Sequence, residues 1–218
     1  MEKHRAYFEL LDAIPKGGCA LCSLVRDGMT SYLRAYLEEG VTDEENWGAL
    51  KAAQGWCPRH ARALDKEADG LAVALFYGHL LEEALHQTTA EASKLDRLKA
   101  ALATKAAPCP GCQREQESEH GWAHLLAHAA AESEAQAVMA PHLHLCVPHL
   151  RLSLRFAQGA SLSWLRADQG AKLRRLAEEN AEFVRKTSAN GRGTEPLGVE
   201  ADSWRRALKA WYGIRWGA

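Results

Sequence analysis

The sequence lacks the features that mark several large classes of protein. Its formal net charge is −1, so it has neither the basic surplus that signals nucleic-acid binding nor an acidic excess. No signal-peptide pattern follows Met1, because charged residues lead directly into an amphipathic stretch. The longest apolar run begins at Leu71 and is broken at Gly78 and His79, too short to cross a bilayer. These absences predict no membrane segment and no nucleic-acid partner, and favour the cytoplasm.

Familiar catalytic motifs are also missing. There is no glycine-rich phosphate loop, no Gly-x-Ser-x-Gly elbow and no Cys-x-x-Cys-His haem attachment site. No catalytic site is therefore evident, and the sequence favours a protein that is not an enzyme.

Strand patterns with a period of two are nearly absent, whereas helix-forming residues with helical periodicity dominate. The sequence therefore predicts an all-α fold. Helices are expected at 2–14, 22–39 and 44–54, from Pro58, at 70–103, 113–131 and 132–140, from Pro148, and at 161–187 and 200–211.

All six cysteines fall into one spacing scheme. Cys19-x-x-Cys22 is followed, after residues 23–56, by Cys57-x-x-His60. The same arrangement recurs as Cys109-x-x-Cys112 and, after residues 113–145, Cys146-x-x-His149. In a reducing compartment such spacing points to metal or redox chemistry rather than disulfides.

The repeat of both cysteine motifs and helix order indicates an internal duplication. The expected organisation is a first helical module at 1–104, a second at 105–189, and a loop with a C-terminal Trp/Arg-rich helix at 190–218. Each module is expected to be pinned by its own Cys3His site, so that Cys19, Cys22, Cys57 and His60 share one metal and Cys109, Cys112, Cys146 and His149 share the other.

Zinc is the preferred metal, in two structural sites, because three thiolates and one imidazole complete a tetrahedral shell with no open position. Each ligand pair lies where a helix is expected to begin, and free backbone N–H groups there stabilise thiolates. The remaining negative charge would be offset by Lys16 and Arg59, or by Arg114 and Arg151. An iron–sulfur cluster stays open as the alternative, and His142 and His144 are possible competitors of His149.

Several stretches together resemble an uncharacterised prokaryotic family with a duplicated CxxC…CxxH helical module. They are Cys19–Cys22, Gly55–His60, Asp69–Leu75, Pro108–Cys112, Leu145–His149 and Glu200–Leu208. The resemblance covers most of the chain and implies membership of that family, but no activity comes with it.

Two weaker histidine patterns are present. Glu83-x-x-His86 and Glu117-x-x-His120 match the spacing of di-iron carboxylate bundles and would make the chain a carboxylate–histidine metalloenzyme. His120, His124 and His128 form a stripe at helical spacing that would bind a metal or haem. Solvated or packing roles are the simpler interpretation of both patterns.

The C-terminal segment carries Trp204, Leu208 and Trp211 at helical spacing, among several arginines. This spacing favours docking of the last helix on the bundle, with contact to a protein partner as the alternative. The leading hypothesis is a zinc-stabilised helical protein with an interaction or regulatory role. The alternative is an iron–sulfur or redox-responsive thiolate–metal protein.

Overall fold

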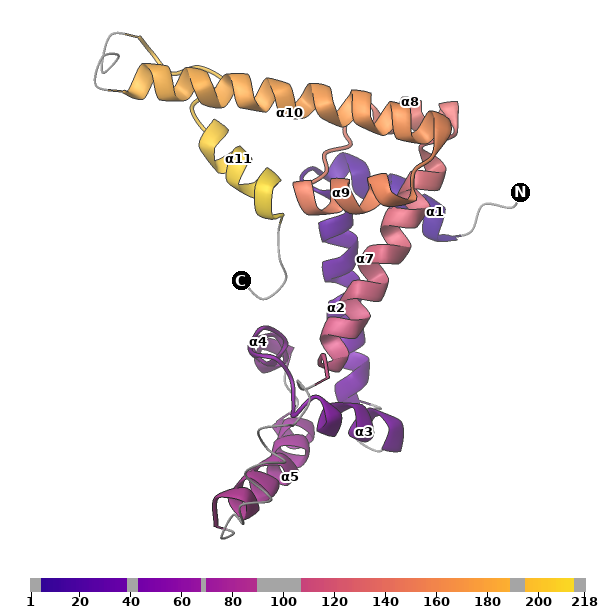
Figure 1. Cartoon of the computed structure of the whole chain (residues 1–218), viewed down its shortest axis with the longest axis vertical. Helices are drawn as coiled ribbons and strands as arrows, with labels where there is room; N and C mark the ends of the chain where they lie inside the picture. Colours follow the sequence, from indigo (N-terminus) through magenta and orange to yellow (C-terminus); the bar gives the residue numbers. More distant parts are fainter. Residues whose placement is uncertain (1–4, 39–42, 68–69, 90–106, 189–194, 214–218) are drawn as a thin grey trace, which may run out of the picture. The chain divides into compact units, whose positions relative to one another are not determined.

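The structure is a computed structural model that describes residues 5–38, 43–67, 70–89, 107–188 and 195–213 (Figure 1). Within these ranges the chain is helical with short connections and contains no strand, which confirms the predicted all-α fold. A search of the same residues finds no helix with the length and hydropathy needed to span a membrane.

The helices follow one another in an order close to that predicted. They are α1 (Arg5–Ala13), the short η1 (Ile14–Lys16), α2 (Ala20–Glu38), α3 (Glu44–Ala52), α4 (Pro58–Glu67), α5 (Gly70–Thr89), α7 (Pro110–Ala129), α8 (Ser133–Met139), α9 (Val147–Phe156), α10 (Gly159–Thr187) and α11 (Ser203–Tyr212). The predicted continuation of the fifth helix beyond residue 89 lies outside the described residues.

Local sequence signals explain where several helices begin. The carboxylate of Asp43 accepts a hydrogen bond from the Asn46 backbone N–H at 3.0 Å and so caps α3. Pro58 is the first residue of α4, as expected, and Pro148 lies in the first turn of α9. The starts of α4 and α9 matter because they directly follow Cys57 and Cys146 of the repeated motif.

Contacts divide the chain into two units. The described residues of the first unit come from 5–26 and 118–213, and those of the second from 27–117. The boundaries fall inside α2 and α7. The boundaries predicted at 104 and 189 were drawn from the sequence repeat. The two contact-based units divide instead after residues 26 and 117.

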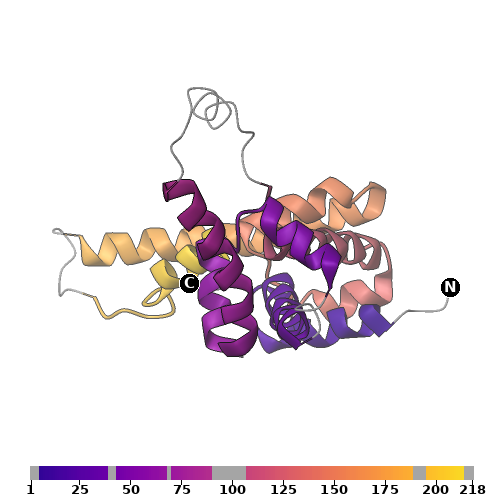
Figure 2. The ribbon, with the colours of Figure 1, turned by 90° about the horizontal axis from the view of Figure 1, so that it is seen from below.

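The core of the first unit joins residues from both ends of the chain. Its fully buried side chains include Leu10, Leu21, Leu126, Met139 and Leu165, and three cysteines belong to the same cluster. Helix α9 packs against α10, and α11 packs against both (Figures 1 and 2). This burial of apolar side chains supplies the main favourable free energy of folding for the unit.

The core of the second unit is aromatic. The rings of Tyr36 and Trp56 meet edge-on with centroids 4.9 Å apart, and Phe76 lies 5.6 Å from Tyr36 and 4.9 Å from Trp47. Edge-to-face and tilted contacts are the favourable arrangements for such rings. Trp56 directly precedes Cys57, so the aromatic core fixes the turn that carries this thiol.

An ion pair ties the connection before α11 to α10. Lys186 on α10 donates to the nearly buried carboxylate of Glu200 at 2.8 Å, and the backbone N–H of Gly198 donates to the same oxygen at 2.9 Å. The hydrogen bond from Lys186, followed by the backbone donor, lowers the pKa of Glu200 from 4.5 to about 2.

We expect this pair to make stability depend on pH. Because the pKa of Glu200 is lower in the folded chain, its contribution is fully present above pH 4.5 and is lost as the pH falls towards 2. Glu200→Gln should therefore destabilise the protein at neutral pH, and the difference from wild type should shrink through this window. Denaturant unfolding of both chains at matched pH values measures it. A difference independent of pH would contradict the assignment.

Candidate metal centres

The eight predicted ligands gather into two sets of four, but not the two expected. Cys19, Cys22, Cys146 and His149 form the first centre; Cys57, His60, Cys109 and Cys112 form the second centre. The pairing within each half of the sequence was therefore wrong. Each centre combines the Cys-x-x-Cys pair of one repeat with the Cys-x-x-His pair of the other.

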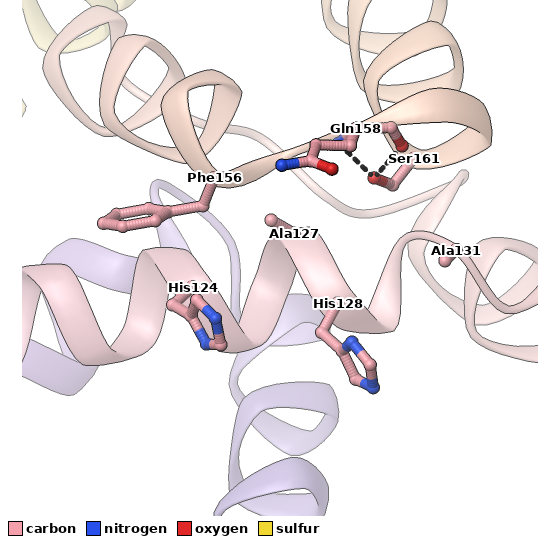
Figure 3. Close-up of a pocket in the computed structure, with 7 residues that line it drawn as sticks. All are labelled: His124, Ala127, His128, Ala131, Phe156, Gln158 and Ser161. Atoms are coloured by element: carbon pink, nitrogen blue, oxygen red, sulfur yellow. Dashed lines mark hydrogen bonds between the residues drawn. The ribbon is translucent and has the colours of Figure 1, made fainter.

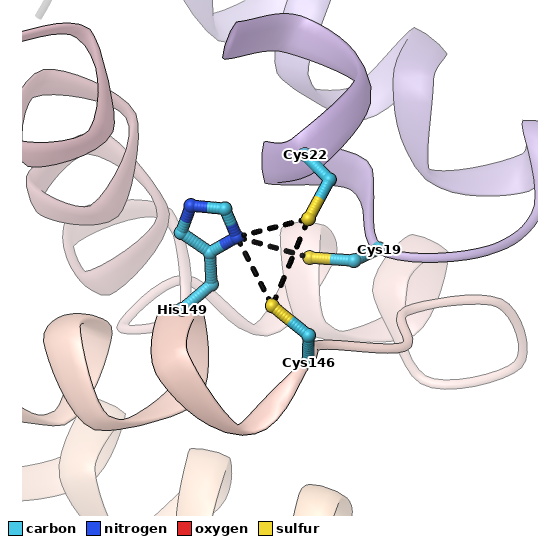
Figure 4. A group of neighbouring side chains, drawn as sticks. All are labelled: Cys19, Cys22, Cys146 and His149. Carbon is cyan, nitrogen blue, oxygen red and sulfur yellow. Dashed lines mark hydrogen bonds between the residues drawn. The ribbon is translucent and has the colours of Figure 1, made fainter. Parts of the chain in front are cut away.

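The first centre lies in the core of the first unit (Figure 4). The Nδ1 atom of His149 lies 3.4 Å from the sulfur of Cys19, 3.3 Å from that of Cys22 and 3.2 Å from that of Cys146. The sulfurs of Cys22 and Cys146 are 3.7 Å apart. All four side chains are buried.

The second centre has nearly the same dimensions. Nδ1 of His60 lies 3.3 Å from the sulfur of Cys57, 3.4 Å from that of Cys109 and 3.6 Å from that of Cys112. The sulfurs of Cys112 and Cys57 are 3.7 Å apart. Here His60 and Cys109 are buried, whereas Cys57 and Cys112 are partly exposed.

These distances match the edges of a tetrahedron around one ion. With metal–sulfur and metal–nitrogen bonds of about 2.3 and 2.05 Å, a tetrahedral zinc site has sulfur–sulfur edges of about 3.8 Å and sulfur–nitrogen edges of about 3.5 Å. In each centre all four donor atoms lie within 4.8 Å of one another. The two sets are therefore groups of residues with the composition and spacing to hold a metal ion.

Backbone pairing brings the two ligand turns of the first centre together. Cys19 forms an isolated parallel bridge with His144, two residues before Cys146. The side chain of Gln169 on α10 holds the same turn, accepting from Leu145 N–H and donating to the Leu143 carbonyl, both at 2.9 Å. His144, the predicted competitor, therefore contributes its backbone to the bridge with Cys19. The ring nitrogen of the ligand set comes from His149.

A close approach around a glycine defines the second centre. The N–H of Ala107 donates to the carbonyl of Ala52 at 3.3 Å, which places the chain before Cys109 beside the end of α3. A Cβ atom on Gly111 would lie 2.7 Å from the His60 ring. Gly111 is the middle of the Cys109–Cys112 turn, so only a residue without a side chain lets the imidazole reach the thiols.

Two carboxylates that no sequence motif singled out face the outer side of the imidazoles. Nε2 of His60 is 3.9 Å from a Glu115 oxygen, and Nε2 of His149 is 3.6 Å from a Glu119 oxygen. Carboxylates in this position orient a metal-binding histidine and increase its basicity. Glu115 and Glu119 lie four residues apart on α7, shortly after Cys112, and that helical spacing was the signal available in the sequence.

In each centre the hydrogen bonds among the thiols lower the pKa of one cysteine and raise that of another, so some thiols hold their protons more tightly than others. In the first centre, hydrogen bonds with Cys146 and Cys22 lower the pKa of Cys19, while those with Cys19 and Cys22 raise that of Cys146. Burial lowers the pKa of His149, but hydrogen bonds with Cys19, Cys22 and Glu119 raise it to about 12. A divalent ion would displace these protons, so metal binding should weaken as the pH falls.

The second centre differs in its histidine. Burial, followed by the charge of Arg59, lowers the pKa of His60, which keeps its ring neutral and ready to bind metal. Burial raises the pKa of Cys57, but the backbone N–H groups of His60 and Arg59 and the Cys109 and Cys112 thiols bring it below its usual value. Burial and hydrogen bonds with Cys109 and Cys57 raise the pKa of Cys112 to about 12.

Of the cations expected to offset the thiolates, Arg59 has the clearest role. It forms a bidentate ion pair with Glu115 and also hydrogen-bonds Cys112. Arg114 and Arg151 instead lie over the rings of Tyr32 and Trp211, at 5.9 and 5.7 Å.

The weaker candidate sites do not assemble among the described residues. Glu117 pairs with Arg114 at 3.6 Å and belongs to neither group of potential ligands; the Glu83 side chain lies outside the described residues. The His120 and His124 rings meet Phe156 edge-on, and His124 and His128 line a shallow cavity of about 240 Å³ (Figure 3). The stripe therefore has a packing role at Phe156.

Comparisons with family models, with curated proteins and with solved structures each found no significant match.

We expect Gly111→Ala to abolish the second centre alone, because the new methyl group would overlap the His60 ring. Competition with a chromogenic chelator should find about one bound metal per chain instead of about two. The matched control is Gly121→Ala on the same helix, where nothing lies within 4 Å of the added atom. Full metal content in Gly111→Ala would contradict the described approach of His60.

Proposed function

We propose that the protein binds one zinc ion in each centre as a structural cross-link, and that it acts by binding a protein partner rather than by catalysing a reaction. The observation that carries the proposal is the pair of four-donor sets with tetrahedral edge lengths. Four protein ligands fill a tetrahedral shell and leave no position for substrate or water, which is the pattern of structural zinc sites.

The compactness of each set supports a single ion over the iron–sulfur alternative. A cluster places several irons and sulfides between its ligands, so those ligands lie further apart than around one ion. Donor atoms that all lie within 4.8 Å of one another support a single ion. Thiolates with imidazole are ligands that zinc prefers among divalent ions available to cells. Thiolate ligands also imply a reducing compartment, consistent with a cytoplasmic location.

Elemental analysis of anaerobically purified protein should find about two zinc ions per chain and a colourless sample. Removal by a strong chelator should abolish cooperative thermal unfolding, because structural zinc sites contribute about 10 kcal/mol or more to folding. Adding zinc back should restore the transition, whereas magnesium should not. A brown sample containing iron would contradict the proposal.

The partner surface is proposed on α11, whose outer face is apolar. Trp204, Leu208 and Trp211 are 46%, 57% and 56% exposed, so about half of each side chain stays accessible although the helix docks on α9 and α10 as expected. The helix packs through a neighbouring side, where Ser203 is buried and Arg206 pairs with Glu179 at 2.5 Å. Small and paired residues face inward, and the large apolar ones face outward.

An amphipathic helix of a protein partner, with carboxylates beside its apolar face, fits this surface. Trp and Arg are the residue types that contribute most to protein interfaces. Arg205 lies 4.8 Å from the Trp204 ring, and Lys209 is exposed on the same turn as Leu208.

Trp204→Ala combined with Trp211→Ala should weaken partner binding by more than tenfold, because two large apolar contacts are lost (about 2 kcal/mol or more). Partner retained from cell extract by immobilised wild type should be lost with this variant. The matched control, Phe8→Ala with Val184→Ala, removes two similarly exposed apolar side chains of the same unit. Equal retention by both variants, or binding of the wild type to anionic vesicles instead, would contradict the proposed surface.

A further inference from the structure

The two centres differ in how deeply their cysteine residues are buried. In the first centre, Cys19, Cys22 and Cys146 are at most 7% exposed. In the second centre only Cys109 is covered to this extent, while Cys57 and Cys112 are partly exposed. Oxidation of cysteine follows thiolate character and access, so the sulfurs of otherwise similar centres should differ in reactivity.

The end of α11 provides part of the cover over the first centre. A Cβ atom on Gly213 would lie 3.0 Å from the sulfurs of both Cys22 and Cys146, so the backbone of this residue lies directly against them. Gly213 has a φ of +72°, which suits glycine and ends the helix at this point. The two covered sulfurs correspond by position in the motifs to Cys112 and Cys57 of the second centre.

The partly exposed cysteines of the second centre are also placed to react with each other. The sulfurs of Cys57 and Cys112 lie 3.7 Å apart. The pair therefore combines access with a second sulfur within reach.

We propose that the second centre is an oxidation site, in which a peroxide joins Cys57 to Cys112 by a disulfide and releases the metal, while the first centre retains its own. The inference rests on the proposed zinc centres and adds a chemical difference between them. The oxidant class is a peroxide, with hydrogen peroxide as the simplest member.

The reaction balances in two steps. One of the two thiolates, Cys57 or Cys112, attacks one peroxide oxygen, the O–O bond breaks, and hydroxide leaves as the sulfenic acid forms. The other thiolate then attacks the sulfenic sulfur, forms the S–S bond and displaces a second hydroxide. Two protons convert the hydroxides to water, so two thiolates lose two electrons and the peroxide gains them. Zinc keeps only Cys109 and His60 as ligands and dissociates.

The test uses the zinc-loaded full chain with hydrogen peroxide and a chromogenic zinc indicator. Release should be biphasic, with about one zinc per chain lost in a first phase on the order of tenfold faster than the second, because access controls the rate. Peptide mapping after the first phase should find the Cys57–Cys112 disulfide, with Cys19, Cys22 and Cys146 still alkylated as thiols after denaturation. The Gly111→Ala chain, which should hold only the first centre, should lack the fast phase.

Single-phase release of both ions, earlier loss from the first centre, or a Cys109–Cys112 disulfide in place of the predicted one would overturn the inference. A chain that carries no zinc before oxidation would instead refute the zinc centres themselves, so the two failures are distinguishable by the metal content of the starting sample.

Discussion

The structure depends on one constraint: residues far apart in the sequence must meet at two points to complete two sets of metal ligands. The first centre joins α2 to the start of α9 across 124 residues, from Cys22 to Cys146. The second joins the start of α4 to that of α7 across 55 residues, from Cys57 to Cys112. A bound ion at each point would exclude unfolded conformations in which these segments separate, much as a disulfide does. The repeats are thus interlocked, since neither holds a complete ligand set.

Much of this could be predicted from the sequence. The helical periodicity and the helix-starting prolines Pro58 and Pro148 are local signals, and the structure agrees with them. The eight residues of the two centres follow from spacing, because a Cys-x-x-Cys or Cys-x-x-His turn places two donors side by side whatever surrounds it. The two ligands that one turn supplies can therefore be predicted without knowing the fold.

The pairing of the turns was not predictable in this way. Closing the chain from Cys22 to Cys146 instead of to Cys57 raises the separation from 35 to 124 residues, which costs only about 1 kcal/mol because closure entropy grows with the logarithm of length. Core packing outweighs so small a difference. Contacts such as the Cys19–His144 bridge and the close approach of Gly111 to His60 decide which turns pair. These contacts have no periodic pattern in the sequence from which they could be predicted. The spacing of the apolar residues in α11 likewise identifies an apolar face, but it does not tell how much of that face the bundle covers.

The two centres share a plan and differ in their surroundings. Each has a histidine whose Nδ1 faces the thiols and whose Nε2 faces a glutamate of α7. The first is enclosed by a large core and by the end of α11, while the second borders a smaller aromatic core and leaves two sulfurs accessible. This difference in burial is the basis of the proposal that oxidation affects the second centre first.

The most direct test is the zinc content of two double variants measured against a competing chelator. Cys19→Ser with Cys146→Ser removes two ligands of the first centre and should leave about one zinc per chain. Cys19→Ser with Cys57→Ser removes one ligand from each centre and should leave almost none. The reverse result, with zinc retained in the second variant and lost from the first, would show that each repeat binds its own ion and would contradict the interlocked arrangement.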